Sequence, residues 1–404
     1  MTANKHLPKI LAGLIFLFCV VIFLPIFEDN AKWNYVIPIA LAISLFASPA
    51  VLSSSKWESY SLKILGLLLV WYIFLFFHRY LFPPGTEYAF NKLPLLAFIS
   101  FIGAFAIPAA VENFRAWHLA AAALTAVGAV FTIISFFPST ELSNARYSTI
   151  GLNPALLAKL TAIPIIAALS FRNGPSPLRT LLFVLAILAV AGSINTGSRT
   201  PLVAVCIAYA AHLLVRFRFK EIIRSAGIYT VLGAVFLIYL GFGNPEVVER
   251  FSFEALSVAN NSDEGDRVFL YQLAIETIQA NPMGIGLGNF STIFWINAPH
   301  NIYLESISET GWIGIIPVIL LTWIGVKSSI FLFKADDAFG TFIAIFFVYN
   351  LVTSIVGNEL TLPSLMFYIS IGLSGAYAHC LKRERRDGPQ PALRTHISYA
   401  TRAS

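Results

Sequence analysis

The stretch HNIYLESISETGWIGIIPVILL (residues 300–321) joins a polar segment directly to an apolar one. Its first half holds a histidine, an asparagine and two glutamates, whereas residues 310–333 contain a single charged side chain, Lys327. A helix of about 20 mostly apolar residues is long enough to cross the hydrocarbon core of a bilayer. The stretch therefore predicts a membrane-spanning helix with polar groups gathered at one end.

The composition of the whole chain points to the same class of protein. Hydrophobic residues make up 57% of the 404 residues, charged residues make up 12%, and mean hydropathy is +0.75, whereas a soluble domain carries about 25% charged residues. Because a helix satisfies its own backbone hydrogen bonds in lipid, we predict an all-α polytopic membrane protein, with one integral membrane domain over residues 1–404. Twelve spans are expected, at residues 8–27, 33–53, 60–82, 93–111, 116–138, 153–171, 178–195, 200–216, 224–243, 301–333, 338–357 and 361–381.

The basic residues predict the orientation of these spans. If both termini are cytoplasmic, most of the 27 lysines and arginines face the cytoplasm, including the basic tail at 382–404, as the positive-inside rule requires. The net charge of +6 then reflects membrane topology and gives no evidence of nucleic-acid binding. Residues 244–300 form a long outer loop, in which two short helices are expected, at 245–256 and 266–280.

Five arginines on the predicted outer side need an explanation, because the positive-inside rule works against them. They are Arg79, Arg146, Arg199, Arg250 and Arg267. One interpretation is that they bind an anion, and the other is that some of them pair with outer acidic residues.

Four predicted helix starts on the outer side favour the anion. They carry proline at or near the first helical position, in LNP (Asn153), SRTP (Arg199), APHN (His300) and TLP (Thr361). Each start offers free N–H groups and partial positive charge, and helix N-termini together with arginine are a common way to hold phosphate. Lys159, two turns into its helix, adds a cation near the lipid headgroups, or simply extends its amine to the interface.

His300 is the best candidate for a general base, since it opens a predicted helix within a dense polar cluster. A helix N-terminus and nearby arginines disfavour the imidazolium and keep the ring able to accept a proton. Asn301, Glu305, Ser308 and Glu309 fall within about 100° of arc and form a polar stripe expected to face a cavity. A structural role for a lone interfacial histidine is the competing interpretation.

The remaining motifs carry little chemistry. The glycine-rich GIGLGNF (284–290) follows no strand and precedes no phosphate-binding lysine, so a tight turn is expected rather than a nucleotide loop. No histidine, cysteine or carboxylate cluster has the spacing of a metal site.

Taken in order, several segments resemble the O-antigen ligase and polymerase superfamily. They are ARYSTIGLNPALLA (145–158), TGSRTPLVA (196–204), DRVFLYQLAIETI (266–278), NPMGIGLGNF (281–290) and HNIYLESISETGWIG (300–314). The resemblance covers roughly residues 145–315, and the other spans agree only in number and hydropathy.

The resemblance implies a glycosyltransferase of the GT-C type in the bacterial inner membrane, with its active site facing the periplasm. Its donor would be a glycan on undecaprenyl pyrophosphate, and in the ligase branch the acceptor is lipid A–core. The key histidine of the family matches His300 and its arginines match Arg199 and Arg267, and no metal or other cofactor is implied.

Physical reasoning about this reaction assigns the remaining candidates. The pyrophosphate leaves already charged, so it needs cations more than a proton donor, and Arg146, Lys159 and Asn153 join Arg267 as donor-binding candidates. Carboxylates and amides near His300 would orient it or bind acceptor sugars: Asn301, Glu305, Glu309 and Glu359. The alternative for Glu305 and Glu309 is structural pairing with an arginine.

Two further classes of function remain open at this stage. A polymerase or a protein oligosaccharyltransferase of the same superfamily would use the same donor with another acceptor. A transporter of the lipid-linked glycan would use the arginines as its pyrophosphate site, but the repeated halves typical of transporters are not evident.

Overall fold

The computed structural model describes residues 6–24, 29–52, 60–137, 140–142, 146–148, 153–172, 174–196, 198–217, 267–294, 298–335, 337–357 and 360–387. Nearly all of these residues are helical. The helices are α1 (Leu7–Phe23), α2 (Asp29–Leu52), α3 (Tyr60–Leu81), α4 (Glu87–Ser100), the π-helical η1 (Phe101–Ala106), α5 (Ile107–Phe114), α6 (Trp117–Ile134), α7 (Pro154–Ser170), α8 (Ser176–Asn195), α9 (Thr200–Val215), α13 (Arg267–Ala280), α14 (Asn289–Phe294), α15 (Ile302–Ala335), α16 (Ala338–Gly357), the 3₁₀ turn η2 (Leu362–Ser364) and α17 (Leu365–Asp387).

Seven helical segments within the described residues are long and apolar enough to cross a membrane. They are Tyr60–Leu81, Glu87–Phe114, Trp117–Ile134, Ser176–Asn195, Ile302–Ala335, Ala338–Gly357 and Leu362–Arg386. Three shorter apolar helices, α1, α7 and α9, accompany them. The prediction of a polytopic helical membrane protein is therefore confirmed.

Each predicted span coincides with a helix except 224–243, which lies outside the described residues. The fourth span is longer than expected, because α4, η1 and α5 continue one another over Glu87–Phe114. One departure from the predicted all-α fold is an antiparallel hairpin of β1 (Thr140–Leu142) and β2 (Arg146–Ser148).

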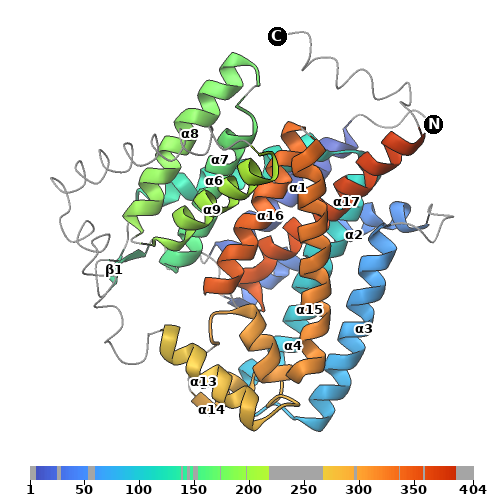
Figure 1. The fold of residues 1–404 in the computed structure, drawn as a ribbon, viewed down its shortest axis with the longest axis vertical. Helices are drawn as coiled ribbons and strands as arrows, with labels where there is room; N and C mark the ends of the chain where they lie inside the picture. The colour runs from blue at the N-terminus through green and yellow to red at the C-terminus, as the bar shows by residue number, and fades with distance from the viewer. Residues whose placement is uncertain are drawn as a thin grey trace.

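The helix α16 lies at the centre of the bundle, packed against α7, α9, α15 and α17 (Figure 1). Most of its side chains are buried, among them the aromatic rings of Phe339, Phe342 and Phe346. A helix that is apolar all round belongs inside a bundle. The candidate site lies at the C-terminal end of α16, next to the ends of these neighbouring helices.

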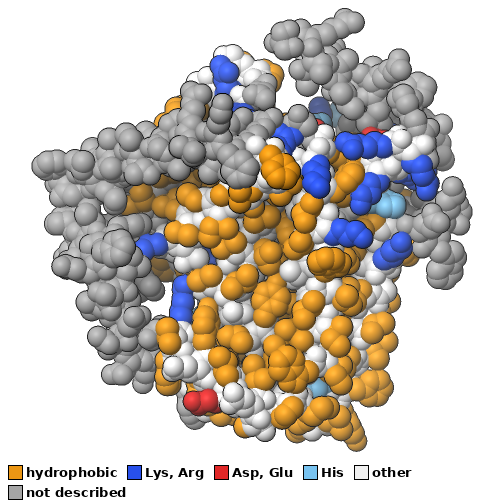
Figure 2. Space-filling model, in the orientation of Figure 1, with side chains coloured by type: hydrophobic (Ala, Val, Ile, Leu, Met, Phe, Trp, Pro, Cys, Tyr) orange, Lys and Arg blue, Asp and Glu red, His pale blue; other side chains and the backbone are white. Residues whose placement is uncertain are grey.

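The outward face of the bundle is apolar (Figure 2). On α15, for example, Trp312, Ile316 and Trp323 are half or more exposed. A soluble monomer rarely exposes a contiguous apolar surface of this kind, whereas lipid tails solvate it without cost. Lysine and arginine side chains gather at the end of the molecule where α17 finishes (Figure 2). Basic residues are typical of the cytoplasmic ends of membrane spans.

The short helices α13 and α14 lie at the end of the bundle opposite to the end of α17 (Figure 1). The predicted helix at 266–280 is confirmed as α13, and α14 is a second helix that the sequence did not predict at this position. The other predicted helix, at 245–256, lies outside the described residues.

Candidate functional site

The helix α15 is broken near its start, at Gly311. This residue has φ 71° and ψ −175°, a conformation that is open almost only to glycine. Residues 302–310, here called the half-helix, are thereby separated from the apolar part of α15 that follows. The predicted uninterrupted helix over 301–333 is wrong at this point, because one glycine changes the direction of the chain.

The Gly-rich turn (residues 282–288) closes the open end of the half-helix. Its backbone N–H groups at Ile285 and Gly286 donate to the carbonyl oxygens of Ser308 and Glu309, at 3.0 and 2.8 Å. The last carbonyls of a helix have no partner within the helix, and this turn provides two. The expected tight turn is confirmed, with positive φ at Gly284, Gly286 and Gly288.

The Gly-rich turn is itself fixed to the loop between α3 and α4. The Asn289 side chain accepts from the Gly85 N–H at 2.9 Å and donates to the Pro83 carbonyl at 3.1 Å. The His78 Nε2 donates to the Met283 carbonyl at 2.8 Å. Two of the recognised motifs, NPMGIGLGNF and HNIYLESISETGWIG, therefore form one hydrogen-bonded unit.

His300 lies just before the half-helix. Its φ of 54° is left-handed, which is uncommon for a residue other than glycine. The Asn301 Oδ1 accepts from the N–H groups of Tyr303 and Leu304, at 3.0 and 3.2 Å, and so caps the helix. The helix begins at Ile302, so the prediction that His300 opens it is wrong by two residues. His300 is nevertheless at the positive end of the half-helix.

The polar stripe of the half-helix is buried against α4 instead of facing a cavity, which corrects the prediction. The Lys92 Nζ lies 2.6 Å from the Glu305 Oε1 and 2.8 Å from the Glu309 Oε2. All three side chains have no more than 1% of their residue surface exposed. The Glu305 Oε2 also accepts from the Leu360 N–H at 2.9 Å. Glu305 and Glu309 therefore hold a buried lysine.

Two cations meet at the C-terminal end of α16. The Lys159 Nζ donates to the Gly357 carbonyl oxygen. A Cβ placed on Gly357 would lie 3.6 Å from the Arg267 Nη2 and 3.8 Å from the Lys159 Nζ, so both side chains reach the same point. A helix C-terminus carries partial negative charge that stabilises cations. The structure thus brings together Lys159 and Arg267, two of the predicted anion-binding residues.

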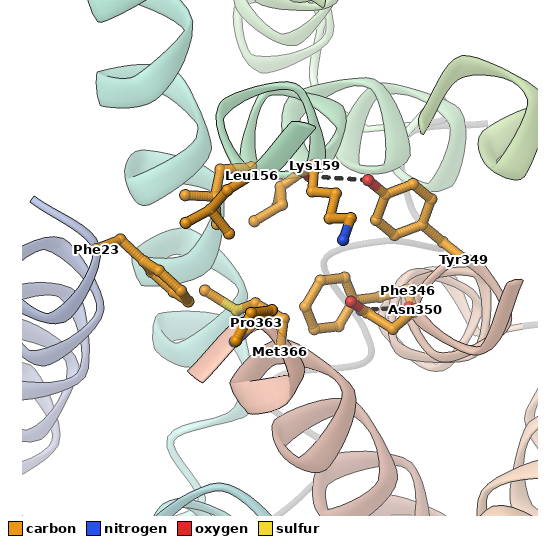
Figure 3. A pocket seen from close by; sticks show the side chains of 10 residues that line it. Phe23, Leu156, Lys159, Phe346, Tyr349, Asn350, Pro363 and Met366 are labelled. Atoms are coloured by element: carbon orange, nitrogen blue, oxygen red, sulfur yellow. Dashed lines mark hydrogen bonds between the residues drawn. The ribbon is translucent and has the colours of Figure 1, made fainter. Parts of the chain in front are cut away.

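A small pocket opens beside Lys159 (Figure 3). The lysine amine points into it, and the Tyr349 hydroxyl, which donates to the Lys159 carbonyl at 2.9 Å, borders one side. The rest of the lining is mostly apolar: Phe23, Leu156, Leu160, Ile163, Phe346, Asn350, Pro363 and Met366. These residues come from the end of α1, the first two thirds of α7, the middle of α16 and the start of η2 and α17, so the pocket extends from the predicted outer end of the bundle toward its middle.

Arg199 lies at the start of α9, directly before Thr200 and Pro201, as predicted. The helix α9 packs against α7 and α16, which carry Lys159 and Gly357. The segment before Arg199 also contacts α7, because the Ser193 and Thr161 hydroxyls lie 2.6 Å apart. The TGSRTP motif is therefore next to the helix that holds Lys159.

Two of the other predicted residues lie at helix starts, and three lie where the structure describes no side chain. Asn153 caps α7, accepting from the Ala155 N–H through Oδ1 at 2.9 Å, so the helix start at LNP is confirmed. Thr361 precedes η2 as expected. Arg146 is in β2, but its side chain is not described. Glu359 and Arg250 lie outside the described residues.

Sequence reasoning missed Lys92, which was placed just outside the predicted span 93–111. The available signal was a lysine at the edge of an apolar run and two glutamates four residues apart on another polar helix. Nothing in the sequence joined them, because the lysine and Glu309 are separated by 217 positions.

Comparison with known proteins supports four of the five motifs recognised in the sequence, and ARYSTIGLNPALLA (145–158) lies outside the matched residues. Residues 182–319 match the family model described as O-antigen ligase, a segment that includes Arg199, Arg267, the Gly-rich turn and the half-helix. No curated protein matches the chain. The match agrees with the O-antigen ligase and polymerase resemblance of the sequence and does not distinguish a ligase from a polymerase. Residues 182–319 therefore carry the sequence pattern of the O-antigen ligase family model.

Proposed function

We propose that the chain is an O-antigen ligase. It transfers a glycan from undecaprenyl pyrophosphate to lipid A–core at the periplasmic face of the bacterial inner membrane, within a GT-C type bundle whose termini are both cytoplasmic. The observation that carries this proposal is the convergence of Lys159 and Arg267 beside Gly357. Three residues later, the Leu360 N–H donates to Glu305 of the half-helix that follows His300. Two cations and a histidine suit a reaction that releases pyrophosphate.

In the proposed donor site, Lys159 and Arg267 bind the pyrophosphate, and Arg199 stabilises the charge that develops as it leaves. Arg146 and Asn153 are further donor-binding candidates, since β2 contacts α7, and α7 begins at the Asn153 cap. Cations in a site of low dielectric constant stabilise a developing anion far more than they would in water.

In the proposed reaction His300 accepts the proton of the acceptor hydroxyl as its oxygen attacks the anomeric carbon. The new C–O bond forms as the bond from that carbon to the phosphate oxygen breaks, and its electron pair leaves with undecaprenyl pyrophosphate. Attack opposite the leaving group inverts the anomeric centre. The leaving group is met by lysine and arginine, so we propose that the reaction needs no metal ion. One base is sufficient, whereas glycoside hydrolysis usually uses two carboxylates.

The carboxylates and amides near His300 have roles in this proposal that follow from their contacts. Asn301 orients His300 by capping the half-helix, and Glu305 and Glu309 orient it through Lys92. Their burial removes them from direct binding of acceptor sugars. Glu359, in the outer loop before Leu360, remains the candidate for acceptor binding.

Reconstitution in vesicles tests the function directly. The purified protein is supplied with undecaprenyl-pyrophosphate-linked glycan and three acceptors: lipid A–core, a second lipid-linked unit, and a peptide. We expect glycan on lipid A–core, with and without a chelator. Extension of the second lipid-linked unit would instead make the chain a polymerase, and extension of the peptide would make it an oligosaccharyltransferase. Movement of the donor across the bilayer with no covalent product would make it a transporter.

A further inference from the structure

Lys92 and its two glutamates form a buried charged cluster inside the bundle. The cluster holds one positive and two negative side chains, and all of them are buried. The Lys92 Nζ donates to both oxygens of Glu309 at 2.8 Å, lies 2.6 Å from Glu305 and faces the Tyr88 ring at 5.7 Å. Removing such charges from water is costly, and ionisable groups at membrane depth usually serve a function.

The cluster connects three parts of the candidate site. Glu305 is on the half-helix, about one and a half turns after His300. Its second oxygen accepts from the Leu360 N–H, and Leu360 follows Gly357 by three residues, a distance that the chain can extend to no more than about 11 Å. Gly357 is the point where Lys159 and Arg267 converge. Lys92 therefore binds Glu305, a carboxylate of the half-helix that also contacts Leu360, three residues after the point where Lys159 and Arg267 converge.

The half-helix needs such an anchor because it is separated from the rest of α15. Its C-terminal end is held by the Gly-rich turn, and its N-terminal end carries the Asn301 cap and His300. Its contact with α4 through Lys92 is the ionic link that fixes its rotation and its distance from Leu360. A base displaced by about 1 Å from its substrate can lose about a hundredfold in rate.

Building on the proposed function, we propose that Lys92 is a positioning residue for glycan transfer: through Glu305 it fixes the half-helix, and with it His300, relative to the Lys159–Arg267 donor site. Lys92 touches neither donor nor acceptor in this proposal. Its loss changes the attack step and leaves donor binding intact.

The test compares Lys92→Met with Lys92→Arg and Glu305→Gln in vesicles that contain lipid-linked glycan and lipid A–core. Glu305→Gln is isosteric, but its amide presents an NH₂ group to Lys92 or to the Leu360 N–H, so one of the two contacts is lost. For Lys92→Met and Glu305→Gln, kcat is expected to fall at least about tenfold with the donor KM within about twofold. Lys92→Arg, which keeps the charge, is expected to restore most of kcat.

The matched control is Asp337→Asn. Asp337 is also a hydrogen-bonded carboxylate, accepting from the Gly340 N–H at 2.6 Å and the Tyr377 hydroxyl at 2.8 Å, but it precedes the start of α16, at the opposite end from Gly357. It is expected to lower thermal stability without changing kcat. Should a folded Lys92→Met or Glu305→Gln protein keep its kcat, or lose donor binding in place of kcat, Lys92 is not a positioning residue.

Failure of the proposed function gives a different result. If the wild-type protein extends a second lipid-linked unit or a peptide, the ligase assignment fails, and the same kcat comparison made with that acceptor decides the role of Lys92. If the wild-type protein extends no acceptor, both proposals are overturned.

Discussion

Replacing Gly311 with alanine should destabilise the break in α15. The cause is backbone strain and steric overlap rather than the hydrophobicity of the added methyl group. An alanine cannot adopt φ 71° and ψ −175° without strain of about 1 to 3 kcal/mol. Its Cβ would lie 2.6 Å from the Met283 carbonyl carbon and 2.7 Å from the Pro282 oxygen, both backbone atoms that cannot rotate away, and overpacking of this kind costs about 1 to 3 kcal/mol more. We expect the free energy of unfolding to fall by roughly 2 to 6 kcal/mol.

The matched control is Gly66→Ala. Gly66 is inside α3, and a Cβ there would meet no atom within 4 Å, so alanine should stabilise the helix by about 0.5 to 1 kcal/mol. Both variants are measured by denaturant unfolding in detergent and by glycan transfer in vesicles. Gly311→Ala is expected to lose transfer activity even where it remains folded, since the Gly-rich turn and the half-helix can no longer interlock. Equal stability and equal transfer of the two variants would refute the assigned role of the break.

Three further outcomes follow from the same geometry. His300→Ala should reduce transfer by about 10² to 10⁴-fold, as loss of a general base does, at unchanged thermal stability; wild-type levels of glycan-capped lipopolysaccharide in cells would contradict this. Arg267→Ala and Lys159→Met should raise the donor KM in vesicles. Arg79→Ala, which removes a guanidinium lying 4.3 Å from the Phe90 ring centre, should not, and a similar KM in all three variants would exclude the cation pair as the donor site. Asn301→Ala should lower stability by about 1 kcal/mol through loss of the cap and should lower kcat, both measured against wild type.

The spans and several helix starts could be predicted because their causes are local. A bilayer requires a long apolar helix wherever the chain crosses it. Each predicted span within the described residues coincides with a helix, and seven helical segments there are long and apolar enough to cross. The starts at Asn153 and Arg199 were predicted from proline and capping chemistry within three residues, and α7 and α9 begin there. The family resemblance rested on short motifs of the same local kind, and residues 182–319 confirm it.

The interior of the site could not be predicted, because its causes are not local. A glycine within an apolar stretch permits a break without requiring one, and what fixes Gly311 is the turn around Met283 packed against it. The stripe that includes Glu305 and Glu309 has helical spacing whether it faces water or a lysine. Whether the stripe faces water or Lys92 depends on how closely α4 approaches α15. Amphipathic periodicity carries no information about which helix supplies the partner.

The break in α15 explains why the recognised motifs lie together. A free helix end within an apolar bundle would leave backbone groups without hydrogen bonds, a cost of several kcal/mol per group in hydrocarbon. The Gly-rich turn removes that cost at Ser308 and Glu309, and Asn301 removes it at the other end of the half-helix. A short half-helix that is capped at both ends can then place His300 at its positive end without extending the membrane span. Changes in the Gly-rich turn should accordingly act on His300 at a distance, through the carbonyl groups that the turn holds, rather than through any contact with substrate.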